Sequence, residues 1–193
     1  YYYSKKVIKK PMLWILDRVV IPVASGAIFV RIGNFINSEI IGKEVTDFPL
    51  GVQFLKDSIG ARQATIITKI KDPNKAYDAI ANDPEFAEIL ASVPFRHPAQ
   101  LYESFGYIFV FLTLLYFYWQ TNKSKLLGFL FGLVLVLLWT VRFFVEFVKE
   151  AQVDTRGDWL LNTGQWLSIP FVLCGVYFMV KSYKKTYNSD PLS

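Results

Sequence analysis

Long apolar runs, separated by short polar segments, dominate the pattern of this chain. Three windows contain no charged side chain: residues 104–122, 126–141 and 159–180. A helix needs about 20 apolar residues to cross a bilayer core, and ~17 suffices. The second window continues past Arg142 and Glu146, and Asp17 and Arg18 interrupt a fourth, weaker candidate at residues 12–30. The pattern predicts an all-α integral membrane protein with about four transmembrane helices in this chain.

Lysines cluster at the ends of these runs. They lie before the first run, between the second and third, and after the last: Lys5, Lys6, Lys9, Lys10, Lys123, Lys125, Lys181, Lys184 and Lys185. An excess of lysine and arginine marks cytoplasmic loops. Four spans with both ends inside place all three clusters in the cytoplasm, so the net charge of +5 is a topology signal. A nucleic-acid-binding role does not fit, because no cluster sits on a soluble domain that could present it.

Residues 43–96 form the longest stretch without a spanning pattern. β-Branched residues at 64–70 predict a strand, residues 72–75 a turn, and residues 75–93 one or two short helices broken at Pro84. A segment of this length is seldom structureless, so we expect a small α+β extracytoplasmic head or lid. The expected domains are residues 1–42 (cytoplasmic loop, membrane helix and broken signature segment), 43–96 (head), 97–185 (three-helix membrane region) and 186–193 (cytoplasmic tail).

A polar segment, Arg31-Ile-Gly-Asn-Phe-Ile-Asn-Ser-Glu39, follows the first apolar run. On a helix Arg31 and Asn34 share a face, and Asn37 continues it. An arginine at the end of an apolar run can simply snorkel to the headgroups. That alternative leaves the two amides and the carboxylate of Glu39 unexplained. Because glycines recur between residues 26 and 42, we expect the helix to lose its regular pattern here and free backbone groups to line a polar cavity.

Polar side chains also stand at the start of the second run. His97, Gln100 and Glu103 are spaced three residues apart, with Tyr102 among them. A carboxylate in the first turn favours the helix dipole. One interpretation is a helix cap with a hydrogen-bonded histidine. The other is an outward-facing wall of the same polar site as Arg31.

The later runs contribute a third polar group. Arg142 and Glu146 are four residues apart and share a helix face. Charges inside a membrane are costly and usually face the bundle interior. The pair is either a structural ion pair or an arginine that binds a lipid phosphate, oriented by Glu146. Gln165 places one more polar side chain just inside the last run. The inferred topology brings Arg31, His97 and Arg142 toward the outer leaflet.

Four motifs in this order resemble the prolipoprotein diacylglyceryl transferases: Arg31-x-Gly-Asn-Phe-Ile-Asn-x-Glu39, His97-Pro-x-Gln-Leu-Tyr-Glu103, Arg142-Phe-x-x-Glu146-Phe and Gly164-Gln165. The likeness runs from about residue 1 to residue 185. It implies a bacterial multi-pass inner-membrane enzyme that moves a diacylglyceryl group from phosphatidylglycerol to the lipobox cysteine thiol of a prolipoprotein. The products are a thioether and glycerol phosphate. The expected partners are these two substrates and the lipid bilayer.

The resemblance assigns roles to particular residues. The carried-over functional positions are Arg31, Asn34, Glu39, Arg142 and Glu146, and further expected substrate contacts are Asn37, His97, Gln100, Tyr102, Glu103 and Gln165. A free thiol has a pKa of about 8.5, so its attack needs a base. The departing phosphate suits Arg31 and Arg142 as a two-sided clamp. Glu39 and Glu146 orient the arginines or assist proton transfer. This chemistry requires no metal or other cofactor.

Two features depart from the family pattern. The family carries an upstream His-Gly-Gly motif, whereas His97 is the only histidine here. Leu138, followed by Trp139, stands where the family tends to carry a tyrosine. We therefore interpret the chain as the C-terminal piece of a longer protein, inactive alone. Two alternatives remain: a non-catalytic lipid-binding subunit, and a transporter fragment, which predicts an internal repeat that is not visible.

Overall fold

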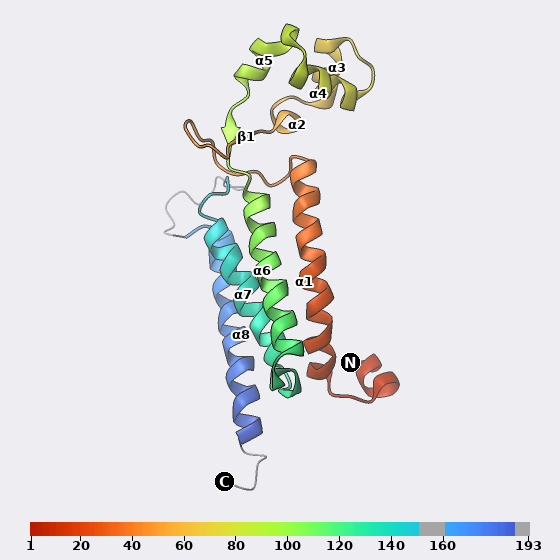
Figure 1. Ribbon diagram of the computed structural model, residues 1–193, viewed down its shortest axis with the longest axis vertical. Coiled ribbons are helices and arrows are strands. Elements are labelled where there is room, and N and C mark those ends of the chain that lie inside the picture. The colour runs from red at the N-terminus through yellow and green to blue at the C-terminus, as the bar shows by residue number, and fades with distance from the viewer. Residues whose placement is uncertain (151–160, 188–193) are drawn as a thin grey trace. The chain divides into compact units, whose positions relative to one another are not determined.

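The structure, a computed structural model, describes residues 1–150 and 161–187 (Figure 1). The chain divides into two compact units. Unit 1 contains Tyr1–Arg31, Tyr102–Phe147 and the described residues after 160. Unit 2 contains Ile32–Leu101 and Val148–Glu150. Each unit has its own arrangement and is described separately.

Unit 1 is a set of apolar helices. Its elements are a one-turn π-helix (Tyr3–Ile8), α1 (Met12–Ile36, whose last turn belongs to unit 2), α6 (Ala99–Trp119), a 3₁₀ turn (Asn122–Lys125), α7 (Phe129–Val145) and α8 (Thr163–Tyr187). By length and composition α1, α6 and α8 can each cross a membrane, and α7 is a shorter apolar helix of 17 residues. The predicted all-α membrane fold with about four apolar helices is confirmed, and the protein is a multi-pass membrane protein. The prediction that residues 12–30 form the weakest span is wrong, because α1 has the highest mean hydropathy of the three long helices.

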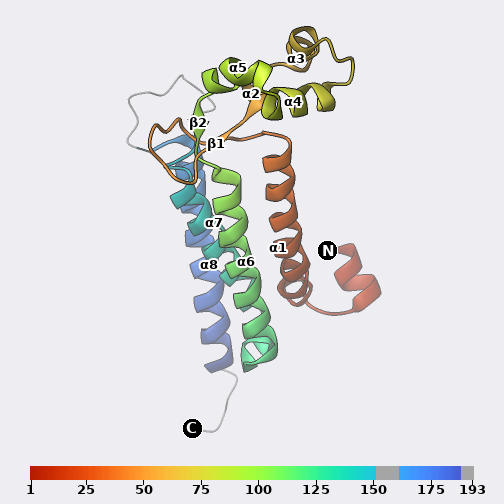
Figure 2. The same ribbon diagram turned by 45° about the horizontal axis from the view of Figure 1, so that its top comes forward.

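Helices α7 and α8 pack most closely, side by side in both side views (Figures 1 and 2). A Cβ placed on Gly132 would lie 2.6 Å from the carbonyl oxygen of Gly175, and the reverse substitution meets the same obstacle. Small residues let membrane helices approach in this way. Further along the same interface Trp139 and Phe171 stack in parallel, with ring centroids 4.1 Å apart.

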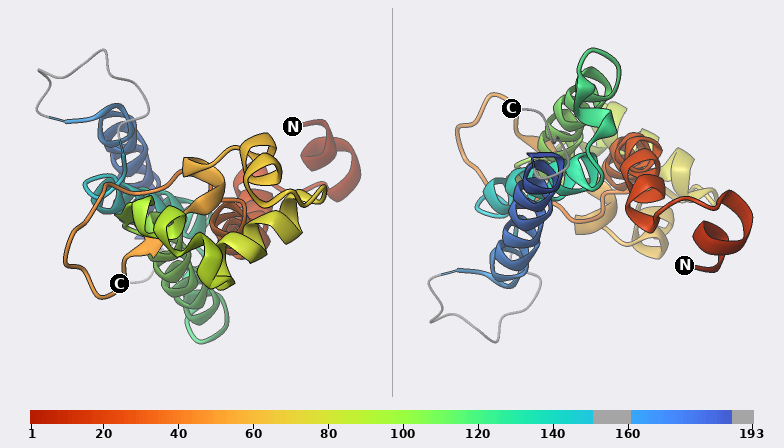
Figure 3. Two further views of the ribbon diagram at one scale, coloured as in Figure 1. Left: turned by 90° about the horizontal axis from the view of Figure 1, so that it is seen from above. Right: turned by 90° about the horizontal axis from the view of Figure 1, so that it is seen from below.

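Helices α1 and α6 complete the bundle, which Figure 3 shows end-on. The shared core consists of buried apolar side chains from α1, α6 and α7: Val20, Ala24, Val110, Leu114, Phe129, Leu130, Leu133 and Val134. In a bilayer such contacts act through close packing rather than through the hydrophobic effect, since lipid tails are equally apolar. The core therefore fixes the positions of the polar groups embedded in it.

Asp17 on α1 is a buried carboxylate that caps another helix. Its side chain is 1% exposed and accepts hydrogen bonds from the backbone N–H groups of Gly128 (2.7 Å) and Phe131 (2.8 Å) at the start of α7. The first N–H groups of a helix lack intrahelical partners and form its positive end, which suits a carboxylate. The charge that weakened α1 as a predicted span is thus neutralised inside the bundle, and this corrects the sequence-based ranking.

Unit 2 combines short helices with a two-stranded sheet. β1 (Val52–Gln53) pairs antiparallel with β2 (Phe95–Arg96), and the other elements are α2 (Leu55–Ser58), α3 (Ala61–Thr68), α4 (Pro73–Asn82), a 3₁₀ turn (Pro84–Phe86) and α5 (Ala87–Ser92). Its small core contains Ala64, Ala76 and Ile80. The Tyr77 hydroxyl donates to the carbonyl oxygen of Ile59 at 2.8 Å, and burial raises the pKa of this hydroxyl.

Two local predictions in this unit are wrong. Residues 64–70 were expected as a strand, but most of them lie in α3, because Ala64 and Ile67 pack in the unit 2 core. Burial of one helical face outweighs the strand preference of β-branched residues. Residues 72–75 were expected as a turn, but they begin α4: Asp72 accepts from the N–H of Asn74 at 2.9 Å, and Pro73 occupies the first helical position. The predicted break at Pro84 is confirmed.

The end of α1 differs from the predicted glycine-broken helix. The helix continues through its glycines to Ile36. It then closes with two backbone hydrogen bonds, from Ser38 to the carbonyl of Phe35 (3.1 Å) and from Glu39 to that of Asn34 (2.8 Å). This is a Schellman motif with Ser38, at φ +57°, in the left-handed position that glycine usually takes. The chain turns after the predicted point, and it does so without glycine.

We predict that Asp17→Asn lowers stability by roughly 2 kcal/mol, because two hydrogen bonds to a charged acceptor lose their charge assistance. Unfolding of the detergent-solubilised protein would measure the loss. Asp47→Asn, at an exposed carboxylate of unit 2, is the matched control and should stay within about 0.5 kcal/mol of wild type. Equal stability of the two variants would show that Asp17 does not cap α7.

A second prediction concerns Ser38. Replacement by glycine removes the Cβ that disfavours the left-handed conformation, so Ser38→Gly should be at least as stable as wild type. Ser38→Val places a β-branched side chain in the same conformation and should destabilise by about 1 kcal/mol or more. Thermal melting of the three proteins checks this order. A valine variant as stable as the glycine variant would contradict the Schellman closure.

Candidate functional site

A buried ion pair links α1 and α6 in unit 1. The Nε of Arg31 lies 2.8 Å from Oε2 of Glu103, whose side chain is fully buried. Arg31 also interacts with the side chain of Tyr107. Glu103 and Tyr107 are one turn apart on the same face of α6. Arg31 is therefore held by two groups of one helix rather than extended toward lipid headgroups.

Arg142 on α7 approaches the same tyrosine. It is close enough to Tyr107 to act on its hydroxyl electrostatically, and its guanidinium lies 5.2 Å from the ring centre of Trp139. Its Nε is buried and has no hydrogen-bond acceptor. Among the described residues no ion pair joins Arg142 to Glu146; the bundle's ion pair joins Arg31 to Glu103. Two arginines thus act electrostatically on one tyrosine inside an apolar bundle.

Glu146 lies where α7 ends and α8 begins. Its carboxylate packs directly against Gly164, where any Cβ would overlap the carboxylate atoms. The side-chain amide of Asn162 donates to the main-chain carbonyl of Glu146 at 3.1 Å. A side chain at position 164 would require the Glu146 carboxylate to move away from the first turn of α8. The Gly164-Gln165 motif therefore has a structural reason at its first residue.

Asn162 and Gln165 form a capping box at the start of α8. The Asn162 N–H donates to Oε1 of Gln165 at 3.0 Å, and the Gln165 N–H donates to Oδ1 of Asn162 at 3.2 Å. Two N–H groups at the helix start are satisfied reciprocally. Gln165 is 2% exposed, and its Nε2 has no acceptor. The Asn-x-x-Gln spacing is the sequence signal of this cap, and the sequence interpretation did not use it.

In unit 2 the side chain of Gln100 holds the main chain at Glu39. Gln100 is fully buried, and its Nε2 donates to the carbonyl oxygen of Glu39. The side chain of Glu39 is exposed, as is that of Asn37 at the end of α1. Asn34 contributes its carbonyl to the Schellman closure. Ile40, which follows Glu39, has φ +54°, an uncommon conformation for a β-branched residue.

His97 belongs to the backbone ladder of unit 2. Gly42 donates to its carbonyl and Lys43 accepts from its N–H, both at 3.0 Å, and its ring meets Phe48 edge-on at 4.7 Å. A Cβ on Gly42 would lie 2.5 Å from the His97 carbonyl oxygen. Gly42 also bridges Lys149, which is buried. The ladder therefore ties residues 41–44, 95–97 and 148–150 together.

The predicted site residues thus fall into two groups. Unit 1 brings together Arg31, Glu103 and Arg142, and it contains Glu146 and Gln165 near the start of α8. Unit 2 brings together Glu39 and Gln100, and His97 lies in its ladder. Asn34 and Asn37 lie at the end of α1, and Tyr102 is half-buried on α6. Sequence reasoning missed Tyr107, hidden in an uncharged run. Its position four residues after Glu103, on the same helix face, was the available signal.

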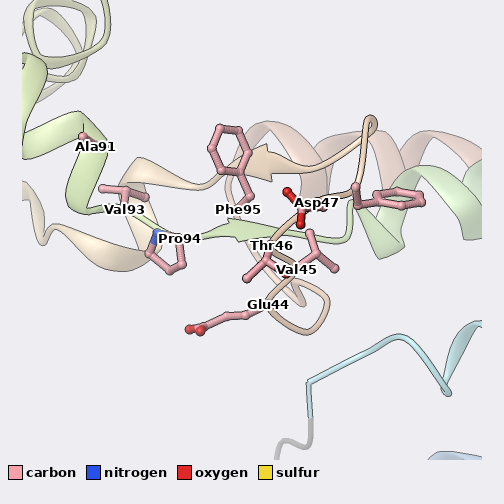
Figure 4. A pocket seen from close by; sticks show the side chains of 9 residues that line it. Glu44, Val45, Thr46, Asp47, Ala91, Val93, Pro94 and Phe95 are labelled. Carbon is pink, nitrogen blue, oxygen red and sulfur yellow. The ribbon is translucent and has the colours of Figure 1, made fainter.

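An open cavity of about 740 Å³ lies in unit 2 (Figure 4). The loop at residues 44–48 and the segment at residues 93–95 line it. None of the predicted site residues lines it, although Phe48 on its rim contacts His97. No set of three or more His, Cys, Asp or Glu side chains within residues 1–150 and 161–187 is placed to hold a metal ion. The size of this cavity therefore does not identify it as the site of the predicted chemistry.

Comparison with known proteins gives a consistent result. A relative from Tolumonas auensis is 39% identical over 173 residues, covering 90% of this chain and 53% of the relative. Relatives from Bacteroides fragilis (38% identical; 89% and 49% covered) and Chloroherpeton thalassium (34% identical; 96% and 56% covered) have the same name, phosphatidylglycerol–prolipoprotein diacylglyceryl transferase. The chain spans about half the length of the curated relatives it matches. Since the family model for prolipoprotein diacylglyceryl transferase matches residues 1–181, the chain belongs to that family.

Proposed function

We propose that the protein transfers a diacylglyceryl group from phosphatidylglycerol to the lipobox cysteine of a prolipoprotein at the bacterial inner membrane. The observation that carries this proposal is that two arginines are buried in an apolar bundle: Arg31 in an ion pair with Glu103, and Arg142 with a buried Nε that has no acceptor. Buried charges in a membrane protein mark functional sites. A pair of arginines suits a phosphate, because each guanidinium presents donors in a planar fork. The names of the relatives supply the substrates.

The reaction requires a phosphate to leave. The cysteine sulfur forms a bond to the glycerol carbon, and the bond between that carbon and the phosphate oxygen breaks. Glycerol phosphate departs with the electron pair, and the thiol proton passes to a base. Negative charge develops on the departing oxygen, where a preorganised cation in a dry site lowers the barrier most. The buried, acceptor-free Nε of Arg142 is such a donor.

The surrounding residues position this cation pair. Glu103 fixes Arg31 and keeps its charge inside the bundle. Glu146, which packs against Gly164, is assigned to orienting Arg142 or to proton transfer. Asn34 is assigned to the glycerol hydroxyls or ester, and Glu39, whose main-chain carbonyl accepts from Gln100, is assigned to orienting the arginines or to proton transfer.

Unit 2 contains the segment assigned as the extracytoplasmic head, residues 43–96. The main-chain ladder through Gly42 and His97 anchors that segment to residues 148–150. Arg96 strengthens the anchor, with ion pairs of 2.8 Å to Glu44 and Glu150. These contacts fix the head, within unit 2, to the segment that follows α7.

The phosphate clamp is tested by Arg142→Lys in the native-length protein. Lysine keeps the charge but loses the fork, so transfer to a lipobox peptide should fall about 10²-fold, close to the effect of Arg142→Ala. Mass spectrometry of the thioether product measures transfer, and thermal melting checks that the variant is folded. The matched control is Arg18→Lys: Arg18 stacks on Trp14 and has no role in the proposed clamp, so transfer by the folded variant should stay near the wild-type level. Near-normal transfer by Arg142→Lys would replace the clamp with a simple charge requirement.

The topology assumed here gives a separate prediction. The up-and-down path of unit 1 brings its three lysine-bearing segments to one end of the bundle (Figure 1). With Cys174 replaced by serine, a cysteine at Ser124 should react with a membrane-impermeant reagent only after the cells are opened. A cysteine at Asn74 should react from outside. Labelling of Ser124 in intact cells would overturn the proposed orientation. Position 154, in the expected outer loop, lies outside the described residues.

A further inference from the structure

The amide nitrogen of Gln165 is a hydrogen-bond donor without an acceptor. The side chain is 2% exposed, and Nε2 is buried and unpartnered. Buried polar groups are almost always hydrogen-bonded, so an exception in a native structure needs an explanation such as a ligand. The proposed clamp of Arg31 and Arg142 does not use this group. The Ser168 hydroxyl, one turn on, donates to the Gly164 carbonyl at 2.7 Å.

The capping box fixes which end of this amide is the donor. Oε1 of Gln165 accepts the N–H of Asn162, so exchanging the two amide atoms would place donor against donor. The same bond holds the side chain in one position at the start of α8. The sequence thus directs Nε2, and not the carbonyl, toward whatever lies beyond the cap.

An apolar groove begins one turn further along α8. It has a volume of about 280 Å³, and seven residues of α7 and α8 line it: Thr140, Phe143, Phe144, Ser168, Ile169, Val172 and Leu173. Ser168, Ile169 and Val172 follow Gln165 by three, four and seven positions, so they share its face of α8. Gln165 therefore lies on the face of α8 that lines the groove, one turn before the groove begins.

We propose that Gln165 and this groove bind an acyl ester of a glycerophospholipid. The groove takes the acyl chain, and Nε2 of Gln165 donates to the ester carbonyl as the ester enters the head of the groove. A free headgroup fits poorly, because the groove has apolar walls and the donor is neutral. A peptide segment fits poorly as well, since each of its residues brings further backbone groups that need partners. In the proposed function, on which this inference rests, Gln165 is a positioning residue for the diacylglyceryl group.

The sharpest variant is Gln165→Glu. Glutamate keeps an oxygen for the Asn162 N–H, as in the usual capping box, but replaces the amide donor with an acceptor. A residue that only caps α8 should tolerate this change. A residue that donates to an ester should not, and we expect the KM for phosphatidylglycerol to rise roughly tenfold or more while the KM for the lipobox peptide stays constant. Gln165→Met, which lacks both functions, separates the loss of the cap from the loss of the donor.

Binding identifies the ligand group directly. The native-length protein in dodecyl maltoside, which carries no ester, is melted with three probes: dioleoylglycerol, its dialkyl ether analogue and glycerol 1-phosphate. Wild type should gain more thermal stability from the diester than from the diether. Gln165→Glu should lose that difference and keep the wild-type response to glycerol 1-phosphate. An unchanged preference for the diester, or loss of the glycerol phosphate response alone, would overturn the proposal.

The groove has its own matched pair of variants. Ile169→Trp fills the groove, whereas Leu167→Trp adds the same ring at a 51% exposed position that does not line it. Ile169→Trp should lower the response to dioleoylglycerol, and Leu167→Trp should leave it unchanged. Equal effects of the two variants would exclude the groove as the acyl site.

These measurements separate the two proposals. If wild type transfers lipid normally but the diester preference is independent of Gln165, only the ester site fails. If the diester preference depends on Gln165 but no thioether forms, the transfer proposal fails and the ester site stands.

Discussion

The burial of charge in an apolar bundle constrains everything else in unit 1. A carboxylate or guanidinium within a membrane span is tolerated only when other protein groups replace its water. Asp17 meets this condition with two backbone N–H groups of α7, and Glu103 meets it with Arg31. Each solution joins two helices, so the charges also fix how the helices pack. Arg142 is less completely satisfied, because its Nε has no acceptor, and this is what makes it suitable for an incoming phosphate.

The same principle explains what could be predicted from sequence. Charged and amide residues stand out against apolar runs, so Arg31, Glu103 and Arg142 were identified without coordinates, and so were the apolar helices. The partners of those residues were harder to find. Asp17 looked like a defect in a span, since its hydrogen-bond donors lie 111 and 114 positions away in the chain. The strand expected at residues 64–70 failed for a similar reason, because tertiary packing selected a helix there.

Around Glu39, the residues with a strained backbone conformation are Ser38 and Ile40 and not the nearby glycines. Ser38 and Ile40 both have positive φ on either side of Glu39, and non-glycine residues keep such conformations only where their surroundings enforce them. The enforcement is visible: the Schellman bonds hold the residues before Glu39, Gln100 holds its carbonyl, and Gly42 begins the ladder after it. A segment fixed at this cost in conformational energy can hold the Glu39 side chain in a defined position while leaving it exposed.

Asn162 and Gln165 together link the cap of α8 to the proposed ligand site. Its side chain accepts from the Gln165 N–H and donates to the Glu146 carbonyl, and its own N–H engages Gln165 Oε1. The end of α7 and the start of α8 are thereby locked together where Glu146 meets Gly164. Because the cap consumes the carbonyl of Gln165 and leaves its amide nitrogen, the requirement for a stable helix start also determines the polarity of the group beside the groove. In the proposal, the side chain of Gln165 both caps α8 and binds the ligand. Only a substitution that keeps the capping oxygen and removes the amide donor can therefore distinguish these two roles.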